Sequence, residues 1–148
     1  MDHGLSDHGL SDHGLSGGCL CGDIRYRIDA VPVEALYCHC RICRRAHGAP
    51  VVAWLNVSRA GFAVTAGSPA VYRSSPAVSR QFCGRCGTPL TWQSLDNPLS
   101  IDVSIATLDD PATIEPSLHI WTESRIAWFE TADQLPRCPT NRRPSPVR

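Results

Sequence analysis

The sequence predicts a mainly β protein made of antiparallel sheets, with one short helical turn. Three observations lead to this prediction: apolar and polar residues alternate over short runs, Gly and Pro separate the runs, and a single segment lacks the alternation. Such alternation is typical of antiparallel strands that bury one face. The 148 residues have the length of one domain.

The first predicted strand is DIRYRID, in which Ile24, Tyr26 and Ile28 share one face. The same pattern recurs in five later segments: PVVAWLNV, AVYRSS, VSRQFC, PLTWQS and LSIDVSI. In the last of these, the apolar positions are Leu99, Ile101, Val103 and Ile105. The exception is RICRRAHG, which is expected to form one or two helical turns that stop at Gly48 and Pro50.

Both ends are expected to lie outside the folded domain. Residues 2–16 are three copies of DHGLS, too polar and too rich in Gly to bury a core, so residues 1–16 are predicted to be a disordered tail. His3, His8 and His13 could form a metal-binding tract, but nothing in the repeat holds three imidazoles in one geometry. The Pro- and Arg-rich residues 138–148 are predicted to be a flexible tail.

Charge and hydropathy exclude several classes of partner. Fourteen basic residues, all Arg, balance fourteen acidic ones, so no electrostatic feature points to nucleic acid or to an anionic membrane. The N-terminus lacks the apolar region of a secretory signal, and no apolar run reaches the ~20 residues of a membrane span. We therefore expect a cytoplasmic protein, in which thiols stay reduced.

The eight cysteines then point to a metal or to catalysis before disulfides. Cys38, Cys40 and Cys43 lie within six positions, with no fourth cysteine beside them, although tetrahedral zinc takes four ligands. The C-x-x-C pair of Cys83 and Cys86 is followed by Gly, as in a metal-binding turn. Cys19 and Cys21 form another pair, with C-x-C spacing. This spacing places both sulfurs on one side of an extended backbone.

Two arrangements of these thiols are possible. A four-sulfur site of Cys19, Cys21, Cys83 and Cys86 would leave Cys38, Cys40 and Cys43 as a three-sulfur site with an open position. Alternatively, Cys40 and Cys43 could join Cys83 and Cys86 in a zinc ribbon. The ribbon leaves three cysteines without a role, so economy favours the first arrangement.

Five segments resemble one known family: GGCLCGDIRYRI, YCHCRICRRAHGAPVVAWLNV, VYRSSPAVSRQFCGRCGTPL, LDDPATIEPSLHIWTESRIAWFE and DQLP. Residues 17–137, which contain them in this order, resemble the glutathione-dependent formaldehyde-activating enzyme family, which also includes centromere protein V. The resemblance implies a β-tent fold of antiparallel sheets and two zinc ions per chain. It assigns a structural zinc to Cys19, Cys21, Cys83 and Cys86, and a catalytic zinc to Cys38, Cys40 and Cys43.

An open zinc site with three thiolates favours sulfur chemistry. The site would carry a net charge of about minus one, which makes it a poor Lewis acid for water, whereas zinc holds a soft exogenous thiolate readily. The family's reaction is similar, because glutathione adds through sulfur to formaldehyde to give S-hydroxymethylglutathione. We therefore predict a zinc-dependent carbon–sulfur lyase that acts on glutathione-type thiol adducts.

Four residues are predicted to contact the substrate. Arg44 and Arg45 flank the ligands and could bind the two carboxylates of glutathione, although a solvated polar face accounts for them equally well. Arg41, between two ligands, would instead orient a thiolate. The resemblance of SLHIWTESR to the family places His119 and Arg125 at the border of the pocket.

The roles of three further residues near or beyond the cysteine motifs can also be predicted. His47 lies four residues after Cys43, so on a helical turn it could complete the tetrahedron and make the second site structural. His39 alternates away from its cysteine neighbours and is expected to pack or to face solvent. Cys138 stands where the family pattern leads us to expect an aromatic residue, and we expect a free surface thiol there.

Two other functions compete with the lyase. One is a non-enzymatic zinc-binding interaction module, and the other is a redox or metal-buffering protein whose thiolates are oxidised and release zinc. The balanced charge argues against nucleic acid as the partner of such a module. Zinc release under mild peroxide, compared with turnover of glutathione and formaldehyde, would separate the buffering protein from the lyase.

Overall fold

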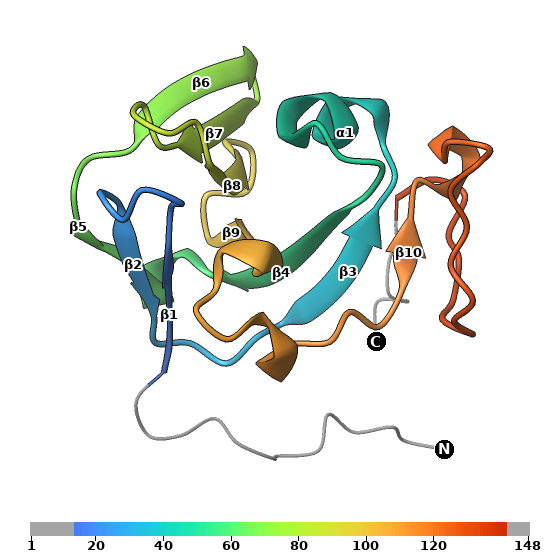
Figure 1. The fold of residues 1–148 in the computed structure, drawn as a ribbon, viewed down its shortest axis with the longest axis horizontal. Helices are drawn as coiled ribbons and strands as arrows, with labels where there is room; N and C mark the ends of the chain where they lie inside the picture. Colours follow the sequence, from blue (N-terminus) through green and yellow to red (C-terminus); the bar gives the residue numbers. More distant parts are fainter. Residues whose placement is uncertain (1–13, 142–148) are drawn as a thin grey trace.

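The computed structural model describes residues 14–141, in which ten strands form two sheets beside a single α-helix. This confirms the mainly β prediction. The smaller sheet is antiparallel and has the strand order β1–β2–β5 (Figure 1). Its strands are β1 (Leu15–Gly18), β2 (Arg25–Ile28) and β5 (Phe62–Ala66).

The larger sheet has the order β10–β3–β4–β9–β8–β7–β6. Neighbouring strands are antiparallel except for β10 and β3, which pair in parallel. Its strands are β3 (Glu34–Cys38), β4 (Val52–Ser58), β6 (Ala70–Ser75), β7 (Val78–Phe82), β8 (Pro89–Ser94), β9 (Ser100–Ser104) and β10 (His119–Ile120). Short 3-10 turns connect them at Arg59–Gly61, Ile105–Thr107, Pro111–Thr113 and Thr122–Ser124.

The main core contains apolar side chains of both sheets. Ile24, Tyr26 and Ile28 are buried on one face, as their alternation predicts. Side chains of β4 and β9 complete this core. Leu99 does not belong to it: β9 begins one residue later, at Ser100, and the Leu99 side chain is 80% exposed.

The predicted helical segment forms α1 (Arg41–His47). Cys40 is its N-cap, and the Cys40 sulfur accepts a hydrogen bond from the backbone N–H of Cys43 at 3.3 Å. The helix ends at Gly48, which adopts a left-handed conformation with φ of 61° that Gly tolerates without a steric cost. Across residues 14–141, helices are too short and too polar to cross a membrane.

The predicted limits of the domain need correction at both ends. Leu15 and Ser16 belong to β1, where Leu15 pairs with Ile28 and packs against the main core, so the fold begins before residue 17. The last DHGLS copy supplies an apolar residue in register with β2. Residues 1–13 of the tract, including His3, His8 and His13, lie outside the described residues.

At the C-terminus, residues 138–140 are hydrogen-bonded to the strand edge and do not fray. The backbone N–H of Cys138 donates to the carbonyl of His119 at 2.9 Å, and that of Trp121 donates to the carbonyl of Thr140 at 2.8 Å. Cys138 is half-buried and packs against a second core cluster that includes Trp54 and Ile120. Cys138 is a free thiol, as expected, but it does not lie on the open surface, because backbone bonding draws this segment onto the protein.

Gly17 provides a test of the contact between β1 and the core. A Cβ at this position would overlap the ring and hydroxyl of Tyr26, which is buried and hydrogen-bonded to Thr107 at 2.7 Å. We expect Gly17→Ala to lower the free energy of unfolding by about 2 kcal/mol or more, measured by urea denaturation. Gly84→Ala is the control, because its Cβ would only meet the Ala70 side chain at 3.6 Å and should change stability little.

Candidate metal centres

Four cysteines from two distant turns form the first cluster. Cys19 and Cys21 follow β1, Cys83 and Cys86 follow β7, and all four sulfurs lie within 4.8 Å of one another. The sulfur of Cys21 is 3.6 Å from that of Cys19 and 3.7 Å from that of Cys83. Zn–S bonds of about 2.3 Å in a tetrahedron separate the sulfurs by roughly 3.8 Å. The cluster therefore fits a four-thiolate zinc site.

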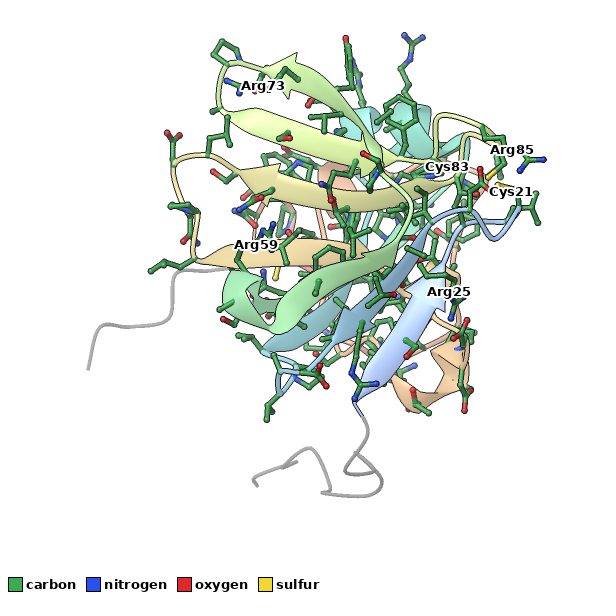
Figure 2. All side chains as sticks on the ribbon, turned by 90° about the vertical axis from the view of Figure 1, so that its left-hand side faces the viewer. Cys21, Arg25, Arg59, Arg73, Cys83 and Arg85 are labelled. Carbon is green, nitrogen blue, oxygen red and sulfur yellow. The ribbon has the colours of Figure 1, made fainter. Side chains whose placement is uncertain are left out.

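This four-cysteine cluster connects the two sheets. β1 belongs to the smaller sheet and β7 to the larger one, and Figure 2 shows Cys21 and Cys83 together at one end of the molecule, beside Arg85. Cys19 and Cys21 lie in a turn between β1 and β2, so their backbone is not the extended strand that the C-x-C spacing suggested. Gly22 follows the first cysteine pair and Gly87 follows the second. Both have positive φ, which Gly adopts without a steric cost, so each turn can close.

Backbone and hydroxyl donors contact three of the four sulfurs in this cluster. The N–H of Ile24 donates to the sulfur of Cys19 at 3.2 Å, and the N–H of Cys86 donates to the sulfur of Cys83 at 3.4 Å. The hydroxyl of Thr88 lies 3.2 Å from the sulfur of Cys86 and lowers the pKa of that thiol to about 5. Donors to sulfur stabilise negative charge, as a metal-binding thiolate requires.

The second cluster contains Cys38, Cys40 and Cys43, whose sulfurs also lie within 4.8 Å of one another. Cys38 ends β3, Cys40 caps α1, and Cys43 lies in the first turn of the helix. The hydrogen bond between the first two thiols lowers the pKa of Cys40, whose thiolate accepts it, and raises the pKa of Cys38, which must keep its proton to donate. A cation is therefore needed to hold all three as thiolates, and this set of soft donors suits zinc.

No fourth side chain joins the three-cysteine cluster among the described residues. The ring of His47 is not part of it and packs edge-on against Trp54, with 5.0 Å between ring centroids. Burial, together with the charge of Arg80, lowers the pKa of His47 to about 4. The structure also separates Cys40 and Cys43 from Cys83 and Cys86, so the thiols gather as four plus three and not as a ribbon.

A cavity lies between α1 and the larger sheet; Ile42 and Arg80, which neighbour the three-cysteine cluster, line it, although none of the three cysteines does. It has a volume of about 580 Å³, within the roughly 300–1,000 Å³ of ligand-binding pockets. One wall is α1, and the other is the sheet segment of β6, β7 and β8, which faces the helix in Figure 1. Residues that line it include Ile42, Arg45, Tyr72, Ser74 and Arg80.

Arg80 was missed in the sequence analysis. Its side chain is buried, its NH2 group donates to the sulfur of Cys43 at 3.8 Å, and its Nε donates to the hydroxyl of Ser74 at 3.3 Å. A signal was present in the sequence, because Val78, Arg80 and Phe82 share one face of the predicted strand and place a charge among apolar residues.

The four residues predicted to contact substrate do not gather in one place. Arg45 lines the 580 Å³ cavity, whereas Arg44 is half-buried on the same helix, and its Nε has no hydrogen-bond partner. His119 and Arg125 line a different cavity, of about 240 Å³. Arg41, expected to orient a thiolate, is exposed.

A chain of hydrogen bonds borders the smaller cavity. Nε2 of His39 lies 2.8 Å from Nδ1 of His119, and Nε2 of His119 lies 3.1 Å from both carboxylate oxygens of Asp133. His39 is only 1% exposed, so it packs and does not face solvent; burial, with the neighbouring His119, lowers its pKa to about 4. Arg125 donates to the backbone carbonyls of Ile126, Ala127 and Phe129, which organises the loop at this cavity.

The fold and the two clusters define a class: a mainly β protein with one four-cysteine and one three-cysteine site that could hold metal ions. Within that class, a family model named "Glutathione-dependent formaldehyde-activating enzyme" matches residues 14–124, and the chain belongs to this family.

The solved structures support the same fold. A crystal structure of a Rhodobacter sphaeroides protein from a structural genomics programme is similar, with a TM-score of 0.56 and 24% sequence identity. The similarity covers 68% of this chain and 91% of the other. No curated protein matches the sequence significantly.

Proposed function

We propose that the protein is a zinc-dependent carbon–sulfur lyase that forms and cleaves S-hydroxymethylglutathione or a closely related thiol adduct. The observation that carries this proposal is the contrast between the clusters. One has four thiols, whereas the other has three and neighbours Arg80, which lines a cavity of ligand size. Membership of the family supports glutathione and formaldehyde as the reactants.

In the proposed reaction, the glutathione sulfur bonds to the formaldehyde carbon, the carbon–oxygen π bond breaks, and the thiol proton is transferred to that oxygen. Zinc bound by Cys38, Cys40 and Cys43 would stabilise the incoming sulfur as a thiolate. Arg45 presents its charge to the cavity from α1, and Arg44 lies on the same helix. We assign these two arginines to the glutathione carboxylates.

His119 and Arg125 are proposed to contact only a small polar reactant. Their cavity of about 240 Å³ is smaller than the roughly 300–1,000 Å³ typical of pockets that enclose larger ligands. The eight free thiols support placement of the protein in a reducing compartment, and we propose the cytoplasm.

The proposed function is tested by measuring the zinc content, the zinc ligands with and without glutathione, and the rate of adduct formation. We expect two zinc ions per chain and, by zinc-edge X-ray absorption, an additional sulfur ligand when glutathione is added. Adduct formation should also exceed the spontaneous reaction measured without protein. A nitrogen ligand already present without glutathione, and lost in His47→Ala, would show a closed site and contradict the lyase proposal.

The burial of the three-cysteine cluster argues against the redox alternative. Cys38 is 3% exposed and Cys43 is 6% exposed, whereas Cys40 is half-buried, so in the folded protein a peroxide reaches chiefly the sulfur of Cys40. We expect mild peroxide to leave the zinc content unchanged over the time of a turnover assay, measured with a colorimetric zinc indicator. Rapid release of one zinc per chain without turnover would favour a metal-buffering protein.

A further inference from the structure

Arg80 is a buried cation without a carboxylate partner among the described residues 14–141. Its side chain extends from β7 toward α1, and among residues 14–141 its polar contacts are the sulfur of Cys43 and the hydroxyl of Ser74. Neither contact is a carboxylate, and the residue is 8% exposed. A buried charge without a counter-charge is strongly destabilising, so the structure requires negative charge near this guanidinium.

The three-cysteine cluster can supply that charge when it holds a metal. Three thiolates and one zinc ion carry a net charge of about minus one, which matches the single positive charge of Arg80. Three neutral thiols would leave the guanidinium uncompensated. Donation from the Arg80 N–H group to the sulfur of Cys43 also orients this ligand, as groups that surround metal ligands commonly do.

We propose that Arg80 is a positioning residue that acts as the counter-charge of the three-cysteine metal site. Its charge stabilises the loaded cluster and reduces the repulsion that an additional thiolate meets there. The first part is independent of the proposed function, whereas the second rests on it. The role differs from that of Arg45, which lines the same cavity but is exposed on α1.

The test compares Arg80→Met, Arg80→Lys and Arg45→Met in the full chain loaded with Co²⁺. Chelator competition and the sulfur-to-cobalt absorption report metal binding at each cluster. We expect Arg80→Met to weaken binding at the three-cysteine site about 10- to 100-fold and to leave the four-cysteine site unchanged. Arg80→Lys should restore a large part of the cobalt affinity, because it keeps the charge. Arg45→Met should bind Co²⁺ at both clusters with wild-type affinity.

Two results would overturn the counter-charge role. One is wild-type cobalt affinity in Arg80→Met. The other is equal weakening at both clusters with no rescue by Lys, which would indicate general damage to the fold. Circular dichroism of each variant identifies such damage directly.

A thiol titration tests the second part. Glutathione and the uncharged thiol 2-mercaptoethanol are added to the cobalt proteins, and the shift of the absorption band is followed. We expect Arg80→Met to lower the affinity of the protein for both thiols, compared with the wild type at full cobalt loading. A loss confined to glutathione would instead show that Arg80 binds a carboxylate. Failure of the wild type to bind either thiol would refute the proposed function, while the metal-affinity comparison still decides the counter-charge role.

Discussion

Cys86→Ser is expected to abolish the native fold. The four-cysteine cluster joins the turn after β1 in the smaller sheet to the turn after β7 in the larger sheet, and 62 positions separate Cys21 from Cys83. Structural zinc sites contribute about 10–16 kcal/mol of apparent binding free energy, which equals or exceeds the ~5–15 kcal/mol net stability of a domain. Loss of one ligand should therefore remove most of the free energy of unfolding. Far-ultraviolet circular dichroism and the zinc content measure the result.

Cys138→Ser is the matched control for this experiment. Cys138 is half-buried and lies outside both thiol clusters, so we expect the Cys138→Ser protein to keep the native spectrum and both zinc ions. A folded Cys86→Ser protein with a normal melting temperature would contradict a structural role for the four-cysteine cluster. Chelation of both metals from the wild type should reproduce the unfolding of Cys86→Ser.

Cys40→Ser is expected to leave a folded protein that holds one zinc ion and has lost adduct turnover. Cys40 both belongs to the three-cysteine cluster and caps α1 through its sulfur. Serine is a favoured N-cap, so this change retains the cap while it removes the metal ligand. The cluster spans only six residues, so the entropy of closing its loop is small and the four-cysteine zinc should keep the protein folded; the free energy of unfolding should still fall, because Arg80 loses its counter-charge.

Cys40→Ala separates the cap from the metal. It should match Cys40→Ser in zinc content and in loss of turnover, but should be less stable by about 1 kcal/mol because the helix cap is also lost. Zinc analysis, thermal unfolding and the glutathione–formaldehyde assay distinguish the variants. Full turnover by Cys40→Ser with one zinc would contradict a catalytic role for this cluster.

Much of the secondary structure was predictable because alternation reports burial directly. Ile24, Tyr26 and Ile28 are buried as predicted, and α1 ends at Gly48 as predicted. The edges of strands were less predictable: Val71 and Tyr72 of the edge strand β6 are both exposed, although their segment shows the β pattern. Alternation shows which residues share a face, but a face is buried only where another layer packs over it.

The division of seven cysteines into four and three was also favoured by spacing and economy. The spacing showed which thiols could share a metal, since side chains two or three positions apart lie on one side of a turn or strand. The location of the substrate residues was not predictable in the same way. Arg45 lines one cavity, and His119 and Arg125 line another, because α1 and β10 lie on different sides of the β3 terminus.

The sequence by itself determined the mainly β class, the short helix and the local thiol groups, because these depend on periodicity and on contacts between near neighbours. Only the tertiary structure placed Arg80 against Cys43, 37 positions apart, and connected His39, His119 and Asp133. It also drew Leu15 and the backbone around Cys138 into the fold. These contacts depend on which strands become neighbours, and strand order is decided by the packing of the whole chain, which local periodicity does not encode.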